Sequence, residues 1–244
     1  MTDWDRLFDD LYLKTYAVQR DEDAGPLALG AMRLAGCEPP ADVLDAACGY
    51  GRHSSALAAA GYRVVGLDRS PVLLAEARRR STGGEWPRWV EGDYRELPFA
   101  AESFDVVVNL FTSFGFFGEE GDLRALAEFR RVLRGGRTLV LETMHRDRLM
   151  AILRGKDWEE LPDGAVRLER RAFDSIEGVI EVALTHWPKG RDPVTVEYRL
   201  RVYTATELKR MAREAGFADV AFYGDPEGAP LSRESRLLLV AKTV

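Results

Sequence analysis

Residues 43–54, which read VLDAACGYGRHS, constrain the fold of this chain more than any other stretch. A short apolar run is followed by Gly49 and Gly51 and then by a segment compatible with a helix. This order predicts a buried strand, a glycine loop and the first turn of a helix. The main chain at both glycines can approach a ligand closely because neither has a side chain. The helix N-terminus offers unpaired N–H groups and a positive dipole end to an anionic group. The stretch therefore predicts a site for a nucleotide-like ligand.

Asp45 narrows the identity of that ligand. A carboxylate beside the loop repels a pyrophosphate, but it suits a cationic amino group. S-adenosylmethionine carries an ammonium, a sulfonium and a carboxylate within a few bonds. In an NAD(P)-binding loop a third glycine allows close helix packing, and here Ser54 occupies that position. The loop therefore favours S-adenosylmethionine over NAD.

Two further acids follow at the ends of later strands. The run at 63–68, RVVGLD, ends in Asp68, which is placed to accept both ribose hydroxyls of a nucleoside. A third strand ends at Glu91-Gly92-Asp93-Tyr94, where Asp93 is placed to accept from an adenine amino group and Tyr94 to offer its main-chain N–H. One such motif alone is weak, but their succession at consecutive strand ends is specific.

Taken in order, these features resemble motifs I, II and III of the class I S-adenosylmethionine-dependent methyltransferases, and FDVVVNL at 104–110 resembles their fourth strand. The resemblance covers residues 40–143 closely and the C-terminal third loosely. It implies in-line displacement of a methyl group from S-adenosylmethionine to a small-molecule acceptor. The residues assigned to the cofactor are Asp45, Ala47, Gly49, Gly51, Asp68, Arg69, Asp93, Tyr94, Leu110 and Tyr16.

The order of elements predicts an α/β fold of the Rossmann-like, doubly wound type, with a mostly parallel seven-stranded sheet. Strands are expected at 42–47, 63–68, 87–91, 104–110 and 137–142, and helices at 52–60, 71–80 and 121–133. Arg134-Gly135-Gly136 is expected to break the chain before the fifth strand. Alternation of this kind requires parallel strands with right-handed crossovers. Ligands then bind beyond the carboxyl ends of the strands, where the strand order reverses.

The first 40 residues are expected to form an N-terminal helical cap on a single domain spanning 1–244. One helix would run from a cap at Asp3 to about residue 18, and a second from Pro26 to residue 35. In related methyltransferases such helices lie over the cofactor pocket. Tyr16, near the end of the first helix, is therefore assigned to the carboxylate of the cofactor.

Residues 144–203 depart from the alternation and are interpreted as an insertion. A helix is expected at 145–154, followed by alternating runs at 165–173, 178–187 and 194–203 that predict a three-stranded antiparallel meander. The meander has one apolar face that must be covered. We expect it to shape substrate access beside the cleft or to pair with a second subunit as a homodimer. A helix at 204–215, capped by Thr204 or Thr206, and strands at 218–223 and 236–242 close the fold.

Catalytic residues cannot be assigned from the sequence, because methyl transfer can be driven largely by alignment and exclusion of water. A base is needed only when the acceptor loses a proton. His145 is the candidate base, and a capping or exposed histidine is the alternative. Asn109 is a second candidate, and satisfying main-chain groups where the sheet opens is its alternative. The acceptor is expected near 110–118, a segment with four phenylalanines.

Composition limits the remaining classes. The net charge of −6 and pI of about 5.3 argue against broad nucleic-acid binding. Two cysteines and three histidines give neither a disulfide framework nor a metal motif. Neither a signal peptide nor an apolar run of about 18 residues is seen, so a soluble, cytoplasmic protein is expected. With 29 Arg, 5 Lys, one Asn and one Gln, the composition is thermophile-like, although a GC-rich genome gives the same bias.

Three alternatives stay open. A methyltransferase acting on RNA or protein is supported only by the arginines between Arg124 and Arg137. An NAD(P)-dependent oxidoreductase is the second alternative. The third is a module that binds the cofactor without catalysis.

Overall fold

The larger of the two sheets is a seven-stranded one that positions the predicted ligand loops. The computed structural model describes residues 6–17, 22–81 and 83–244. The strand order is β10-β11-β5-β4-β1-β2-β3. The strands are β1 (Asp42–Ala46), β2 (Arg63–Asp68), β3 (Arg88–Glu91), β4 (Phe104–Asn109), β5 (Leu133–Thr143), β10 (Asp219–Tyr223) and β11 (Leu237–Lys242). Strands β1 to β5 are parallel, and β11 runs antiparallel to β5. The strand order reverses between β1 and β4, which confirms the predicted doubly wound fold.

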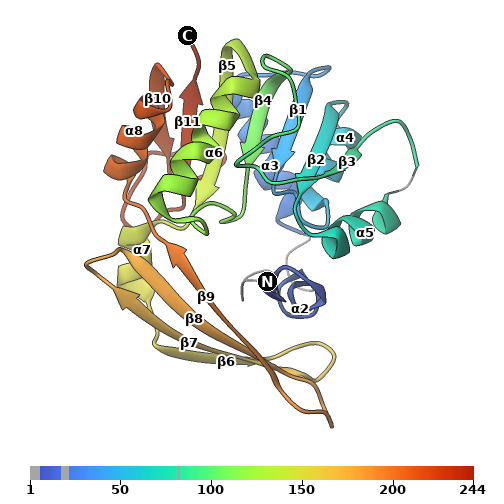
Figure 1. Cartoon of the computed structure of the whole chain (residues 1–244), viewed down its shortest axis with the longest axis vertical. Helices are drawn as coiled ribbons and strands as arrows, with labels where there is room; N and C mark the ends of the chain where they lie inside the picture. Colours follow the sequence, from blue (N-terminus) through green and yellow to red (C-terminus); the bar gives the residue numbers. More distant parts are fainter. Residues whose placement is uncertain (1–5, 18–21, 82) are drawn as a thin grey trace.

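Helices cover both faces of this sheet, as Figure 1 shows. Helices α6 (Gly118–Val132) and α8 (Ala205–Glu214) bury their apolar sides on one face, with Phe129 and Met211 fully buried. Helices α3 (Ala24–Ala35) and α4 (Arg52–Ala59) cover the other face through residues such as Met32 and Leu57. Helix α5 (Pro71–Arg80) connects β2 to β3. The two apolar cores hold the sheet rigid, so that loops at its carboxyl edge have fixed positions.

Strand β5 corrects one expectation about the glycine pair. Arg134-Gly135-Gly136 was expected to precede the strand, but these residues lie inside β5. The pairing of β5 with β4 shifts between Phe104–Leu133 and Val106–Thr138, which is a bulge. Gly136 has φ +69°, a conformation that glycine adopts without strain. The glycines therefore let the strand bend rather than stop it.

The second sheet is four-stranded, not three-stranded as predicted. It has the order β6-β7-β8-β9, with every pair antiparallel. Its strands are β6 (Lys156–Glu160), β7 (Val166–Asp174), β8 (Val179–Trp187) and β9 (Val194–Arg201). The three predicted strands are confirmed, but β6 was missed because its sequence, KDWEE, has no apolar alternation. Helix α7 (Arg146–Ile152) connects β5 to this sheet, which we call the lid sheet.

The N-terminal cap also differs from the prediction. The expected single helix ending near residue 18 is interrupted, because a turn at 8–9 precedes α2 (Asp10–Thr15). The predicted cap at Asp3 lies outside the described residues, and Asp9 caps α2 by accepting the N–H of Asp10. Leu7 and Leu11 pack with Leu184 and Val196 of the lid sheet. Figure 1 shows α2 between the two sheets, so the segment near α2 forms part of the wall between them.

Candidate active site

A cleft of about 1520 Å³ separates the carboxyl edge of the seven-stranded sheet from the inner face of the lid sheet. Its walls come from the loops after β1, β2, β3, β4 and β5, from α2 and α7, and from the lid sheet. Eight of the ten residues predicted to bind the cofactor line this cleft: Ala47, Gly49, Asp68, Arg69, Asp93, Tyr94, Leu110 and Tyr16. Asp45 and Gly51 are not among the lining residues.

Both glycines of the loop after β1 have left-handed main chain. Gly49 has φ +57° and Gly51 has φ +80°. A Cβ at Gly49 would meet nothing within 4 Å, whereas one at Gly51 would lie 2.2 Å from the indole of Trp89. Only Gly49 thus leaves open space on the cleft side. Gly51 must be glycine because the indole of Trp89 leaves no room for a side chain, and the sequence alone did not reveal this contact.

Asp68 holds two loops together at the end of β2. One carboxylate oxygen accepts the N–H of Gly49 at 2.7 Å, and the other accepts the N–H of Ser70 at 2.8 Å. Burial raises the pKa of Asp68, against the lowering effect of these main-chain bonds. An ionised carboxylate has about four lone-pair sites, so Asp68 retains acceptor capacity toward the cleft. This geometry fits a pair of ribose hydroxyls.

Asp93, at the end of β3, is fixed by arginine. Arg95 donates to both carboxylate oxygens, with its Nη2 atom 2.6 Å from one of them. Arg69 lies further away, with 3.8 Å between its Nη1 atom and Asp93. Burial raises the pKa of Asp93, but the hydrogen bonds and charge of Arg95 lower it more, and the carboxyl stays ionised. Tyr94 is buried and donates its hydroxyl to the carbonyl of Ser113 at 2.9 Å, which ties this loop to the one after β4.

Asp45 lies beneath the loop. Its carboxylate accepts the hydroxyl of Ser54 on α4 at 2.5 Å. Burial raises the pKa of Asp45 to about 6, against the lowering effect of the Ser54 bond. The structure thus gives Asp45 a contact with helix α4 rather than a place on the cleft wall. Its predicted contact with the amino group of the cofactor stays a prediction.

Asn109 is fully buried at the end of β4. Its Nδ2 atom donates to the carbonyl of Ala46 at 2.8 Å, and its Oδ1 atom has no hydrogen-bond partner among the described residues. Asn109 is not among the cleft-lining residues, in contrast to the next residue, Leu110. These contacts agree with the alternative interpretation, in which Asn109 provides a hydrogen-bond partner for a main-chain group where β1 and β4 separate.

Two histidines line the cleft, and only one was considered from the sequence. His145 occupies the N-cap position of α7 without a side-chain hydrogen bond to the helix, and it is buried, with its Nδ1 atom 3.1 Å from the carbonyl of Ser235. It is therefore neither exposed nor free to rotate. His53, in the first turn of α4, is buried, and its Nε2 atom has no partner among the described residues. Burial, with the charges of Arg52 and Arg236, lowers its pKa to about 3, so the ring is neutral near pH 7.

Sequence reasoning missed two buried acids on opposite walls, Glu142 at the end of β5 and Glu169 on β7. Glu142 accepts the N–H of Phe111 at 2.7 Å, and its other oxygen lies 3.6 Å from Nη1 of Arg236. Glu169 accepts the hydroxyl of Tyr16 at 2.8 Å. The alternation of 165–173 indicated two faces, but it could not show that Glu169 lies on the face toward the cleft.

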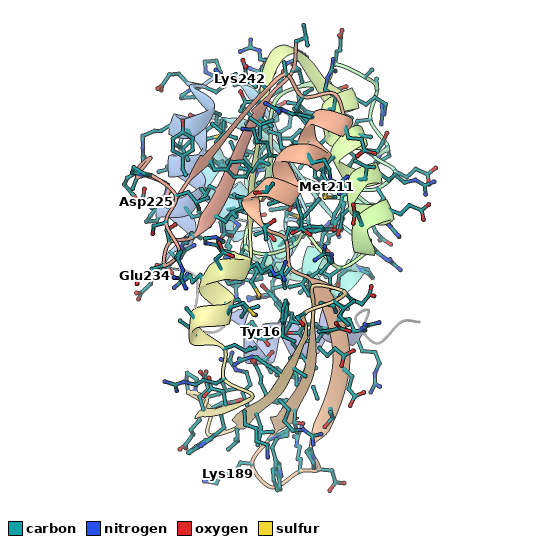
Figure 2. All side chains as sticks on the ribbon, turned by 90° about the vertical axis from the view of Figure 1, so that its left-hand side faces the viewer. Tyr16, Lys189, Met211, Asp225, Glu234 and Lys242 are labelled. Atoms are coloured by element: carbon teal, nitrogen blue, oxygen red, sulfur yellow. The ribbon has the colours of Figure 1, made fainter. Side chains whose placement is uncertain are left out.

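Tyr16 is therefore placed differently from the prediction that it reaches the carboxylate of the cofactor. Its hydroxyl points to the lid sheet, and the guanidinium of Arg167 lies 4.8 Å from the centre of its ring. Figure 2 shows Tyr16 at the level where the two sheets meet.

Among the described residues, no cluster of His, Cys, Asp and Glu fits a metal ion. Within the same ranges, no helix is both long and apolar enough to cross a membrane.

The sequence and the fold resemble those of known methyltransferases. A model of the family described as "Methyltransferase domain" matches residues 43–136. The demethylmenaquinone methyltransferase of Clavibacter sepedonicus is 30% identical over 184 residues, which cover 71% of this chain and 74% of that protein. The CcbJ methyltransferase of Streptomyces caelestis superposes with a TM-score of 0.83 at 24% identity, covering 100% of this chain and 98% of that one. CalS10 of Micromonospora echinaspora, an amino pentose methyltransferase solved with S-adenosylmethionine bound, has a TM-score of 0.73 at 25% identity, covering 96% and 97%.

The fold, the cleft and these relatives define a methyl-transferring enzyme. The chain belongs to the class I S-adenosylmethionine-dependent methyltransferases, and S-adenosylmethionine is its cofactor. The predicted family, fold class and cofactor are thereby confirmed. The open cradle at Gly49 and the spare acceptor sites of Asp68 fit this cofactor. The NAD(P)-dependent oxidoreductase is set aside.

Proposed function

We propose that this enzyme transfers the methyl group of S-adenosylmethionine to a small molecule that binds between the carboxyl edge of the seven-stranded sheet and the lid sheet. The observation that supports it is the cleft of about 1520 Å³, which has the cofactor-type loops on one wall and a separate polar wall opposite them. Pockets for small molecules are concave and mostly apolar, with a few convergent polar groups. The volume suffices for a cofactor and a small acceptor together.

The residues on the cofactor wall have distinct proposed roles. Gly49 allows close approach, Asp68 accepts the ribose hydroxyls, and Asp93 with the N–H of Tyr94 recognises the adenine. Ala47, Arg69 and Leu110 are proposed to complete this wall, and Asp45 and Gly51 to support the loop behind it. The cofactor, when bound, supplies a methyl group on a cationic sulfur. The contribution of the chain is then to hold the acceptor in line with that methyl group and to exclude water.

Nucleic acid as the acceptor has little support, because three of the five arginines that suggested it are paired with acids. Arg131 bonds to Glu128 at 2.7 Å. Arg134 and Arg137 lie 2.9 Å and 3.3 Å from the carboxylate of Asp105. Charges that are already neutralised by neighbouring acids attract phosphates weakly. A small-molecule acceptor is the proposal that remains.

The cofactor and the activity are tested with one protein preparation. Calorimetric titration should show binding of S-adenosylmethionine and S-adenosylhomocysteine and no binding of NADH. Asp68→Ala should weaken cofactor binding by about 1–3 kcal/mol, because buried donors lose their acceptor. Incubation with a panel of small acceptors should release S-adenosylhomocysteine together with a methylated product. Unchanged cofactor affinity in a folded Asp68→Ala protein would contradict the role given to Asp68.

We also propose that residues 1–244 form one domain, with 1–40 as the cap and 144–203 as the insertion, and that the lid sheet joins two subunits. On its outer face, Trp158 of β6 is paired in register with Leu168 of β7, and the two are 69% and 38% exposed. Apolar groups in such a patch favour association. Analytical ultracentrifugation should find a dimer that Trp158→Ser weakens. A monomer at all concentrations would contradict the dimer.

A further inference from the structure

The strongest unexplained feature of the cleft is a carboxylate on the lid sheet rather than on the cofactor loops. Glu169 is only 4% exposed and lies opposite the fully buried Leu184 in the pairing of β7 with β8. Apolar residues such as Val182 and Leu200 share this inner face. A buried charge is costly unless it is paired and hydrogen-bonded. Its presence on the cleft wall therefore calls for a use beyond packing.

Glu169 is held in one orientation by two arginines of its own strand. Arg171 donates to one carboxylate oxygen, and Nε of Arg167 lies 3.4 Å from the other. Arg167 is in turn fixed by the carbonyl of Thr15 at 2.9 Å and by Glu159 at 2.9 Å. These contacts leave Glu169 little freedom to rotate. Toward Tyr16, Arg167 and Arg171, Glu169 is therefore the hydrogen-bond acceptor.

The Tyr16 hydroxyl is consequently fixed as a donor to Glu169. A phenol has one proton, and that proton lies in the 2.8 Å bond to the carboxylate. Burial, with Tyr198 and Glu169, raises the pKa of Tyr16 well above its usual value, so the hydroxyl stays protonated and neutral. The hydroxyl of Tyr198 interacts with that of Tyr16, and even as a donor it would occupy only one of the two lone pairs of the phenol oxygen. A lone pair made more basic by the adjacent carboxylate remains for a ligand.

An amine is the nucleophile that uses such a lone pair best. A neutral primary or secondary amine can donate one N–H to Tyr16 while its own lone pair points at the methyl carbon. A hydroxyl acceptor additionally needs a base during attack, and an aromatic carbon has no N–H or O–H at the reacting atom. Positive charge develops on the amine nitrogen as the new bond forms, and the oxygen of Tyr16 backed by Glu169 stabilises it.

We propose that Tyr16 accepts a hydrogen bond from the nucleophilic nitrogen of an amine acceptor, and that Glu169 is the positioning residue that turns the Tyr16 hydroxyl to allow this. The inference rests on the proposed function. In the transfer, the nitrogen lone pair forms the bond to the methyl carbon, the carbon–sulfur bond breaks, and its electron pair goes to sulfur. S-adenosylhomocysteine and a methylated ammonium result, and the surplus proton of the ammonium passes to water.

The test compares wild type with Tyr16→Phe, Glu169→Gln and the double variant. Tyr62→Phe is the matched control, because its hydroxyl donates to the carbonyl of Cys37 at 2.9 Å, outside the cleft. Amine probes are sarcosine, histamine and glucosamine. Glucose offers the hydroxyls of glucosamine without the amine, and 1,4-naphthalenediol offers aromatic carbon. Products are identified by mass spectrometry, and amine binding to the S-adenosylhomocysteine complex is measured by calorimetry.

At least one amine should be methylated by wild type and by Tyr62→Phe. Tyr16→Phe should lower kcat/KM for it at least 100-fold and weaken amine binding at least tenfold, while affinity for S-adenosylhomocysteine changes less than twofold. Glu169→Gln should lower kcat/KM at least tenfold. The double variant should be no worse than Tyr16→Phe, because a residue that acts only through Tyr16 has nothing further to lose. A purely structural Glu169 would give an additive loss instead.

Several results would overturn the inference and leave the proposed function intact. These are full activity of Tyr16→Phe, methylation confined to glucose or 1,4-naphthalenediol, or no methylated amine from a protein that binds the cofactor. Should Glu169→Gln not fold, Tyr16→Phe alone decides, since it removes one oxygen atom and keeps the ring. A wild type that neither binds S-adenosylmethionine nor methylates any probe would instead contradict the proposed function itself.

Discussion

The carboxylate of Glu142 accepts the main-chain N–H of Phe111 at 2.7 Å, so the end of β5 holds the loop that leaves β4. Phe111 and Thr112 have φ +62° and +58°, in the left-handed region that non-glycine residues rarely adopt. The N–H of Thr112 also donates to the carbonyl of Glu142 at 3.2 Å. Such strain persists only where the surroundings hold it, and it often marks a functional site. Here it fixes the cleft wall next to the proposed acceptor.

Glu142→Ala should therefore loosen this loop. The N–H of Phe111 and the guanidinium of Arg236 would lose a buried partner, which should lower the free energy of unfolding by about 1–3 kcal/mol. Denaturant titration measures it. Glu142→Gln keeps an acceptor oxygen and should lose less, and Glu38→Ala, which removes an exposed carboxylate, should change little. Equal stability of Glu142→Ala and wild type would show that the loop holds its conformation without Glu142.

The two loop glycines should differ on substitution by alanine. Gly49→Ala places a Cβ in open space and should cost about 1–2 kcal/mol from its left-handed main chain alone. Gly51→Ala adds a clash with Trp89 at 2.2 Å and should destabilise more. Gly49→Ala should nevertheless weaken cofactor binding in the folded protein, because its Cβ enters the cleft. Gly25→Ala, in a helix with free space around it, is the control and should stabilise slightly. The reverse order for Gly49 and Gly51 would refute this account of the loop.

Asp45 should make stability fall as pH rises from about 4 to 6. Its pKa is raised from 3.8 to about 6 on folding, so the folded state binds its proton more tightly than the unfolded state does. The contribution is then full below pH 4 and is lost as pH passes through 6, by about 3 kcal/mol in total. The free energy of unfolding is measured for wild type and for Asp45→Asn at each pH. The difference between the two isolates the contribution of Asp45, because the contributions of the other carboxyl groups are the same in both proteins. A constant difference from pH 4 to 7 would contradict it.

His53 should remain neutral across the physiological range. Burial, Arg52 and Arg236 lower its pKa to about 3, so its imidazole signals in an NMR titration should not move between pH 8 and 5. Because the unfolded chain takes up this proton near pH 6.5 and the folded chain does not, His53 lowers stability as pH falls below that value. The signals of His53 are assigned by their absence from the spectrum of the His53→Gln variant. A midpoint near 6.5 would show that the ring is open to water.

The sequence carried enough information for the strands whose ends line the cleft, because those strands are set by local patterns. Strand ends bearing Asp68 and Asp93 fall at the carboxyl edge wherever strands and helices alternate. The capping box of Thr204 with Glu207 is also local, since its partners are three residues apart. Features of this kind depend on residues close together in the chain, so they can be predicted without knowledge of the tertiary structure.

What escaped prediction depends on partners distant in the sequence. Gly51 owes its identity to Trp89, and Glu169 meets Tyr16 across 153 residues. Strand β6 pairs through its main chain, with side chains too polar for any periodic signal. The bulge in β5 likewise uses Gly136 inside a strand, where glycine usually predicts a break. In each case the contact that explains the residue exists only after the chain has folded.

The lid sheet leaves the core after β5 and returns at α8, so most of the wall opposite the cofactor loops belongs to one contiguous stretch of chain, completed by the segment near α2, whereas five separate loops build the cofactor wall. Such an arrangement lets the two halves of the reaction diverge independently. Replacement of this one segment can change which molecule accepts the methyl group without altering the loops that hold the cofactor. A change confined to residues 144–203, the stretch that contains Glu169, would therefore alter the acceptor wall while the loops proposed to bind the cofactor keep their positions.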